Sequence, residues 1–286
     1  MHWQNRRERF RTHLNSKICA YPGSVYDPIS SRIAQDLGFE VGMFAGSVAS
    51  LTVLGDPDHI LLTLSEFAQQ AYRICRASNL PIMVDADHGY GNALNVKRTV
   101  EELETAGVSA LSIEDTELPR RFGSGGKNSL ISIEEGVGKM KAAVAGRSDP
   151  SLVIAARSSA ISVTGINDTI ARITAYQETG VDAIFLIGIK QKQQLEAIAS
   201  ECKLPLILGG AGADIMDLNY MTSQGVSLCL QGHQPVMAAM QATYDALKAL
   251  REGVKPSDLS NRFDKSLITR LSKAEAYDQW MQDFLE

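Results

Sequence analysis

Two carboxylates lie one residue apart near residue 85, directly after an apolar run. Residues 81–84 (Pro-Ile-Met-Val) lead into Asp85 and Asp87, and a glycine-rich turn follows. This run is typical of a strand buried on both faces, as in a parallel sheet. Carboxylates there need a cation or water beside them, because burying an unpaired charge is costly. The alternative is that the pair caps the next helix or accepts turn amides, although a cap needs only one carboxylate.

Other polar residues stand where further apolar runs end. They are Gly46 with Ser47, Glu114 with Asp115, Arg157, and His233. In a parallel barrel the ends of all strands meet at one mouth, so these residues would converge. Acidic oxygens suit Mg²⁺ or Mn²⁺, which is usually held by few carboxylates and keeps several waters. The sequence has no Cys/His cluster that would favour zinc.

These residue types together predict chemistry on a 2-oxo acid. A hard cation chelated by such an acid can accept electron density when a bond beta to the carbonyl breaks, which gives a metal-bound enolate. Arg157 suits a substrate carboxylate because its fork is planar and bidentate. The amides of Gly46 and Ser47 could form an oxyanion hole, and His233 could orient a substrate oxygen or carry a proton.

Each of these interpretations has a structural alternative. Arg157 could be a salt-bridge partner of Asp85 or Glu114. His233 follows a glycine and could simply cap a helix. Ser47 could contribute its backbone amide and not its side chain.

Eight apolar runs recur at the spacing of βα units. This favours a (β/α)₈ barrel in the α/β class over an open doubly wound sheet. Glycines before several of the runs, such as Gly38 and Gly107, are typical helix ends. We expect one domain over residues 1–286, with a helical extension from about 257 to 286. The predicted strands are 18–21, 41–46, 82–85, 110–114, 152–157, 183–187, 206–209 and 228–231.

Composition gives no sign of a nucleic-acid or membrane partner. The chain has 286 residues, a net charge of −5 and a pI of about 5.6, so no strongly basic surface is indicated. No apolar run is long enough to span a bilayer, and the charged N-terminus does not resemble a signal peptide. The four cysteines are scattered and lack metal spacing, which indicates reduced thiols in a cytoplasmic protein.

Several segments together resemble the isocitrate lyase / phosphoenolpyruvate mutase superfamily. The most specific element is Asp-Ala-Asp-x-Gly-Tyr-Gly, and the match covers nearly the whole predicted barrel. The segments are 25–34, 44–50, 84–92, 112–115 and 156–157. Within the superfamily the chain is most similar to the oxaloacetate decarboxylase branch, through His88, residues 91–96, residues 131–139 and Gly232-His233.

The resemblance implies a site and an assembly. Mg²⁺, or Mn²⁺, would lie near Asp85, with Asp87 and Glu114 reaching it directly or through water. The substrate, a small 2-oxo acid, would contact Gly46, Ser47, Arg157 and His233. Members of the superfamily usually form a dimer of dimers by swapping a terminal helix. In this chain the swapped part would carry the apolar residues Phe263, Leu267, Ile268, Leu271, Trp280, Met281, Phe284 and Leu285.

Departures from the superfamily pattern narrow the expected activity. The loop of residues 118–129 has no cysteine, which argues against isocitrate or methylisocitrate lyase activity, and its glycines suggest mobility. Asp58 matches an aspartate that is important in phosphonate-handling members. Ser158-Ser159 replaces the usual Thr-Asn or Thr-Glu after the arginine. Residues 209–213 (Gly-Gly-Ala-Gly-Ala) lack a longer polar side chain, so this loop indicates a more open pocket or a weakened site.

The expected activity is therefore a Mg²⁺-dependent carbon–carbon lyase that decarboxylates oxaloacetate to pyruvate and CO₂. One alternative is another enzyme of the superfamily, either a 2,3-dimethylmalate-type lyase or a phosphonopyruvate-processing enzyme. The other is a barrel that binds 2-oxo acids with little catalysis.

Overall fold

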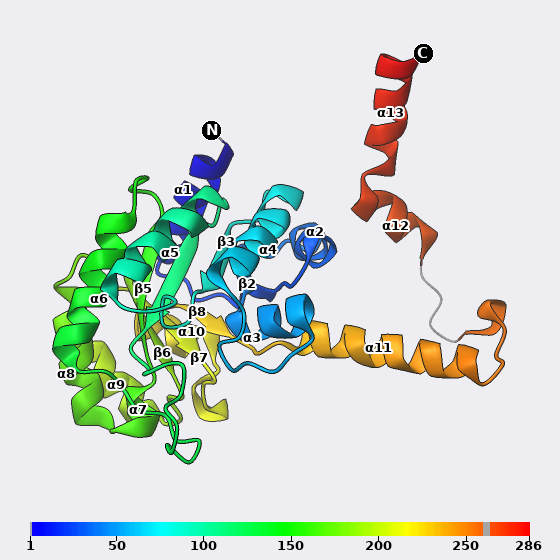
Figure 1. The fold of residues 1–286 in the computed structure, drawn as a ribbon. Coiled ribbons are helices and arrows are strands. Elements are labelled where there is room, and N and C mark those ends of the chain that lie inside the picture. The colour runs from blue at the N-terminus through cyan, green and yellow to red at the C-terminus, as the bar shows by residue number, and fades with distance from the viewer. Residues whose placement is uncertain (1, 260–263) are drawn as a thin grey trace. The chain divides into compact units, whose positions relative to one another are not determined.

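Eight parallel strands form one sheet in which neighbours in sequence are neighbours in space (Figure 1). This is a computed structural model, and it describes residues 2–259 and 264–286. The strands are β1 (Gly23–Ser24), β2 (Gly42–Phe44), β3 (Ile82–Asp85), β4 (Ala110–Glu114), β5 (Val153–Ser158), β6 (Ala183–Ile187), β7 (Leu206–Gly209) and β8 (Val226–Leu230).

The sheet closes on itself through Ala20, just before β1. Ala20 forms a parallel bridge with Leu228 of β8. Its N–H donates to the Ser227 carbonyl at 3.0 Å, and its carbonyl accepts from the Cys229 N–H at 3.0 Å. The predicted α/β barrel is thereby confirmed. The first strand differs from its predicted range of 18–21, because Pro22 has no N–H for a ladder hydrogen bond and separates the Ala20 bridge from β1.

The chain divides into two compact units, Met1–Gly232 and His233–Glu286. In the first unit the helices are α1 (His2–Leu14), α2 (Pro28–Asp36), α3 (Gly46–Ala49), α4 (Leu64–Ala77), α5 (Ala93–Thr105), α6 (Ile133–Gly146), α7 (Ala160–Val163), α8 (Ile166–Gln177), α9 (Lys192–Glu201) and α10 (Leu218–Ser223), with the short helices η1 (Ser50–Leu54) and η2 (Ala213–Ile215). In the second unit they are η3 (Pro256–Asp258), α11 (Gln234–Arg251), α12 (Lys265–Ser272) and α13 (Ala274–Leu285).

Burial of the strands explains their apolar composition. Every residue of β2, β3, β4 and β7 is buried, so the sequences of these strands are continuous apolar runs and not alternating patterns.

Several helices are capped at their first turn by a polar residue at the end of the preceding loop. Asn92, for example, begins α5 by accepting hydrogen bonds from the N–H groups of Leu94 and Asn95. This cap fixes the far end of the turn that carries Asp87.

The second unit exposes large apolar side chains on its helices. They include Met237, Met240, Tyr244 and Leu247 of α11, and Trp280, Met281, Phe284 and Leu285 of α13. Both α12 and α13 lie within the predicted extension of 257–286, whereas Phe263 lies outside the described residues. The prediction of one domain with this extension, and of a helix swapped between subunits, stays a prediction.

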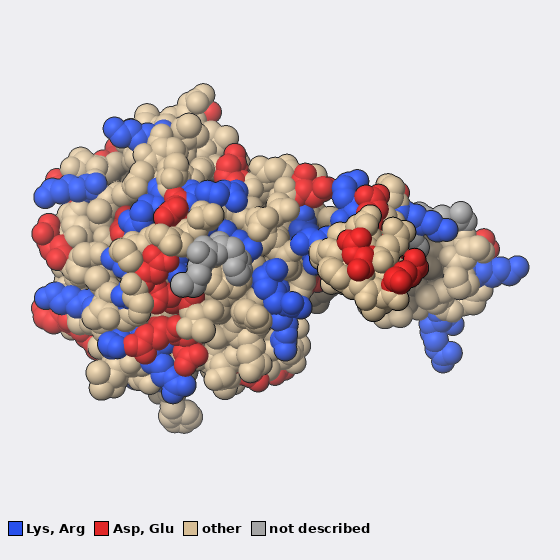
Figure 2. All heavy atoms as spheres, turned by 90° about the horizontal axis from the view of Figure 1, so that it is seen from above, with Lys and Arg blue, Asp and Glu red and all other residues tan. Residues whose placement is uncertain are grey.

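Charges of both signs are interspersed on the molecule. On the face shown in Figure 2, lysine and arginine side chains lie among aspartate and glutamate side chains. None of the helices in the described residues is both long enough and apolar enough to cross a membrane.

Candidate active site

Strand register brings three of the predicted site residues together. Glu114, the last residue of β4, lies opposite Arg157 of β5, and Asp85, the last residue of β3, lies opposite Ser112 of β4. All of these positions are at or near the carboxyl ends of their strands. In a parallel barrel this end is where catalytic residues gather.

Arg157 forms ion pairs with two of the carboxylates. Its Nη1 bonds to Asp85 Oδ2, and its Nη2 lies 3.2 Å from Glu114 Oε2. The Ser112 hydroxyl donates to the other oxygen of Asp85 at 3.0 Å. Burial lowers the pKa of Arg157, but the surrounding carboxylates outweigh this and raise it, so the side chain stays charged. In this structure Arg157 is therefore a salt-bridge partner of both Asp85 and Glu114, as the structural alternative predicted.

One polar atom of Arg157 is left over from these pairs. Its Nε is buried and has no hydrogen-bond partner among the described residues. The guanidinium carbon lies 5.6 Å from the centre of the Phe185 ring on β6, which packs against the same group. Arg157 therefore has at Nε a donor that none of the described residues satisfies.

Asp87 lies beside this cluster, pressed against the start of α3. Its backbone is in the left-handed region, with φ of 47°, and this turns its side chain out of line with β3. A methyl group added at Gly46 would come within 2.6 Å of Asp87 Oδ1 and 2.7 Å of Oδ2. Burial, reinforced by the charges of Asp85, Glu114 and Asp58, raises the pKa of Asp87 well above its ordinary value. Gly46 therefore lies against Asp87, one of the three predicted metal ligands.

Glu114 is buried more deeply than Asp85, the other carboxylate that pairs with Arg157. Burial raises its pKa, while the charge of Arg157 lowers it. The Glu114 N–H donates to the Asp87 carbonyl at 2.8 Å, so the ends of β3 and β4 are tied by backbone as well as by side chains.

Ser47 and His233 each lie at the start of a helix. Ser47 is half-buried in the first turn of α3, directly after Gly46, where helical amides have no intrahelical acceptor. His233 directly precedes α11 and is the first residue of the second unit. Its role toward the cluster remains a prediction.

Asp58 approaches the cluster from the loop that follows η1. Its pKa is raised by partial burial and by the charge of Asp85, while Arg157 and Arg120 lower it. Arg120 belongs to the loop of residues 117–131, whose base is closed by an antiparallel bridge between Thr116 and Leu130. Both loops therefore bring charged groups near the carboxyl end of the barrel.

A second buried network, which the sequence analysis did not identify, lies directly behind the site. The fully buried Asp115 accepts hydrogen bonds from Ser158 at 2.9 Å, Tyr176 at 2.9 Å and Arg172 at 3.1 Å. Burial raises the pKa of Asp115, and the charge of Arg172 opposes this. The Ser158 hydroxyl is therefore a hydrogen-bond donor within this network. The signal in the sequence was the pair Glu114-Asp115 at the end of β4, because consecutive side chains along an extended segment point to opposite sides.

Close packing explains two of the three glycines in residues 209–213. A methyl group at Gly209 would collide with Ile187 and Phe185, and one at Gly212 would collide with the Lys190 backbone. The Lys190 ammonium also donates to the Gly210 carbonyl at 2.5 Å. Packing against β6 and the residues after it accounts for Gly209 and Gly212, whereas Gly210 has a φ of 58° and open space around it. The more open pocket or weakened site stays a prediction.

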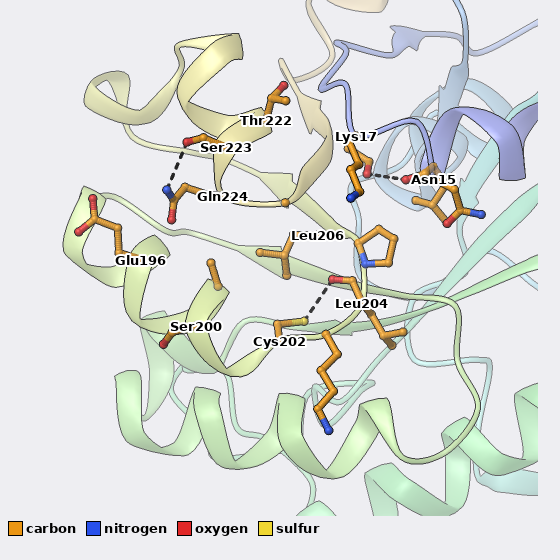
Figure 3. A pocket seen from close by; sticks show the side chains of 16 residues that line it. Asn15, Lys17, Glu196, Ser200, Cys202, Leu204, Leu206, Thr222, Ser223 and Gln224 are labelled. Atoms are coloured by element: carbon orange, nitrogen blue, oxygen red, sulfur yellow. Dashed lines mark hydrogen bonds between the residues drawn. The ribbon is translucent and has the colours of Figure 1, made fainter.

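A separate cavity of about 680 Å³ lies at the opposite end of the barrel (Figure 3). Leu206, the first residue of β7, and Gly225, just before β8, help to line it. Lys17, Glu196 and Cys202 also contribute, and the Cys202 thiol donates to the Leu204 carbonyl at 3.4 Å. Because this is the amino end of the strands, the cavity is distinct from the candidate site.

The carboxylate cluster fits a divalent cation held mainly through water. Asp85, Asp87 and Glu114 bring three carboxylates to one place, and Arg157 supplies one positive charge against them. Across the described residues, no three His, Cys, Asp or Glu side chains are arranged to ligate a metal directly. Mg²⁺ is commonly bound by one or two carboxylates and keeps several waters, so the charge of this cluster suits the ion without three direct ligands from the protein.

A closed parallel barrel with charged side chains gathered at the carboxyl ends of its strands is the architecture of the (β/α)₈-barrel enzymes. Residues 10–251 match the family described as phosphoenolpyruvate phosphomutase. The chain belongs to this family, which confirms the resemblance drawn from its sequence.

Three relatives illustrate the similarity. The oxaloacetate decarboxylase of Bradyrhizobium diazoefficiens is 56% identical, over 96% of this chain and 94% of that protein. The oxaloacetate decarboxylase of Bradyrhizobium sp. strain ORS 278 is 53% identical, over 100% of this chain and 99% of that protein. A crystal structure of phosphonopyruvate hydrolase in complex with oxalate and Mg²⁺ has a TM-score of 0.86 and 26% identity, over 98% and 99% of the two chains.

Proposed function

We propose that this protein is a Mg²⁺-dependent oxaloacetate decarboxylase, a carboxy-lyase that forms pyruvate and CO₂. The observation that carries the proposal is the excess of carboxylates over arginine at the carboxyl end of the barrel, where a divalent cation would complete the charge balance. The reaction is supported by the relatives, which match over the full chain at about half identity and share this name. They bear out the predicted enzyme class and activity.

The cation would be held by Asp85, with Asp87 and Glu114 holding its waters. When bound, Mg²⁺ (or Mn²⁺) withdraws electron density from a chelating 2-oxo acid and so stabilises charge that develops on its carbonyl oxygen. The bond between C3 and C4 of oxaloacetate breaks, and its electron pair passes into the enolate of pyruvate. The C4 carboxylate leaves as CO₂, and a proton then adds at C3.

The chain's own residues orient the substrate for this step. Arg157 stays charged between Asp85 and Glu114, and its guanidinium, including the unpaired Nε, is the proposed donor to a substrate carboxylate. The amides of Gly46 and Ser47 are the proposed donors to the enolate oxygen, where one such donor supplies roughly 3–4 kcal/mol. His233 is the proposed group that orients a substrate oxygen.

Phosphonopyruvate processing is the second candidate because Asp58 lies near the site. The charges of Asp85 and Arg157 both act on its carboxyl group. A phosphonopyruvate hydrolase is also among the structural relatives, at 26% identity. The third alternative, a barrel with little catalysis, loses part of its support, since packing accounts for Ser158, Gly209 and Gly212.

A substrate comparison tests the proposal. Oxaloacetate, phosphonopyruvate and 2,3-dimethylmalate are each supplied with Mg²⁺, and turnover is corrected for decarboxylation by the metal alone. We expect turnover of oxaloacetate in the wild type and its retention in Asp58→Ala. Turnover of phosphonopyruvate alone, lost in Asp58→Ala, would contradict the proposal and favour the second candidate. Oxalate binding without turnover of any substrate would favour the third.

An oligomer is part of the same proposal. The apolar residues exposed on α11 and α13 are suited to packing against a second copy of the chain, as in a helix-swapped dimer of dimers. A cytoplasmic location remains the prediction drawn from the scattered cysteines, which are all free thiols.

A further inference from the structure

Tyr90 adopts a backbone conformation that tyrosine seldom takes. It lies in the turn between β3 and α5, where its φ is 59° and its neighbours Gly89 and Gly91 also have positive φ. Glycine occupies this left-handed region without strain, whereas a large side chain does so at a cost. Such strain persists where the surrounding structure enforces it, and it concentrates at functional sites.

The ring of Tyr90 is held firmly by its neighbours. Its centre lies 6.3 Å from the ring of Phe67 on α4 and 6.2 Å from the ring of His88. Phe67 in turn stacks on Phe44 of β2 with the ring centres 5.1 Å apart. The aromatic packing would be satisfied equally by phenylalanine, so it does not explain the hydroxyl.

The Tyr90 hydroxyl is buried and has no hydrogen-bond partner among the described residues. A buried hydroxyl that is left unpaired lowers the stability of the fold. Burial and the nearby charges of Asp87, Asp85 and Asp58 raise the pKa of Tyr90, so the hydroxyl keeps its proton. It is therefore a buried donor in the turn that carries Asp87, under the influence of negative charges, and it bonds to none of the described residues.

We propose that the Tyr90 hydroxyl donates a hydrogen bond to the water shell of the divalent cation at Asp85, Asp87 and Glu114. This inference rests on the cation site of the proposed function. It makes Tyr90 a positioning residue that holds the cation's waters in place. Hydrogen-bond partners in the outer shell of a metal commonly change its affinity by ten- to a hundredfold.

Tyr90→Phe tests this role with two measurements that need no turnover. One is the melting temperature of the protein prepared without metal, and the other is the Kd for Mn²⁺ from a titration followed by electron paramagnetic resonance. We expect the metal-free variant to melt at or above the wild-type temperature, because an unpaired hydroxyl has been removed. We expect its Mn²⁺ affinity to fall about tenfold. Tyr72→Phe, at an exposed position on α4, is the matched control and should change neither value.

Two results would overturn the proposal. Unchanged Mn²⁺ affinity in Tyr90→Phe would show that the hydroxyl does not serve the cation. A clearly lower melting temperature in the metal-free variant would show that the hydroxyl has a structural partner instead. Neither result would contradict the decarboxylase assignment. That assignment fails separately if the wild type does not turn over oxaloacetate with Mg²⁺.

Discussion

The contact between Gly46 and Asp87 leaves no room for even one methyl group. A Cβ at position 46 would lie 2.6 Å from an Asp87 oxygen, so Gly46→Ala must displace that carboxylate. We predict that Mg²⁺-dependent decarboxylation falls at least tenfold, with the loss relieved in part at high Mg²⁺ because the cation's waters are held less well. Steady-state kinetics over a range of Mg²⁺ concentrations measure both effects.

Gly138→Ala is the control for this substitution. Gly138 lies in α6, where an added Cβ meets nothing within 4 Å. This change should leave activity intact and raise the free energy of unfolding by about 0.5–1 kcal/mol, because alanine favours a helix over glycine. Wild-type activity in Gly46→Ala would contradict the placement of Asp87 in the cation site.

Sequence patterns predicted the residues of the site better than their contacts. Asp85, Glu114 and Arg157 could be selected because each follows an apolar run, and parallel register then brings them together. The pairing of one guanidinium with two carboxylates depends on side-chain geometry across β3, β4 and β5, which spacing does not encode. Tyr90 lay inside the recognised segment, but its strained backbone and unpaired hydroxyl appear only in three dimensions.

At the scale of elements, the Asp115 network ties β4 and β5 to α8. Asp115 follows Glu114, Ser158 follows Arg157, and Arg172 is on α8, so the network supports the strand ends that carry the site. Asp115→Asn removes the charge that faces Arg172, which keeps its ion pair with Asp168 at 2.8 Å. The loss of a buried charge-assisted hydrogen bond should lower the free energy of unfolding by about 1.5–3 kcal/mol. Urea denaturation measures this loss.

A surface ion pair is the comparison for that prediction. Glu102 pairs with Arg98 at 3.3 Å on an exposed face of α5. Glu102→Gln should change the free energy of unfolding by less than about 0.5 kcal/mol, because exposed pairs in water contribute little. Equal losses in Asp115→Asn and Glu102→Gln would refute the structural importance given to the buried network.

The elements themselves were largely predictable. Seven predicted strands match β2 to β8 within a few residues, since continuous apolar runs separated by helical spacing fit few other folds. The first strand was predicted too early in the chain. Ala20 pairs with β8, whereas β1, after Pro22, pairs with β2, and the apolar run alone does not show where this change of partner falls. Spacing along the chain could not show that Ser158 bonds to Asp115 or that Gly209 and Gly212 pack against Phe185 and Lys190.

At the scale of the whole molecule, the helices of the second unit expose apolar side chains that the proposed oligomer would cover. Trp280 and Phe284 lie one helical turn apart on α13, and both are exposed. The double substitution Trp280→Glu with Phe284→Glu should convert the predicted tetramer into smaller species, measured by light scattering after size-exclusion chromatography. Gln282→Glu, on the same helix, should leave the assembly unchanged. A wild-type monomer, or a tetramer that survives the double substitution, would contradict this prediction.

The central claim is that Asp85 anchors a divalent cation on which decarboxylation depends. The most direct measurement is pyruvate release from oxaloacetate with and without Mg²⁺, for the wild type and for Asp85→Ala, after subtraction of decarboxylation by the metal alone. The account predicts rapid release in the wild type that requires Mg²⁺ and is lost in Asp85→Ala. Full Mg²⁺-dependent turnover in Asp85→Ala, or wild-type turnover no faster than the background, would contradict it.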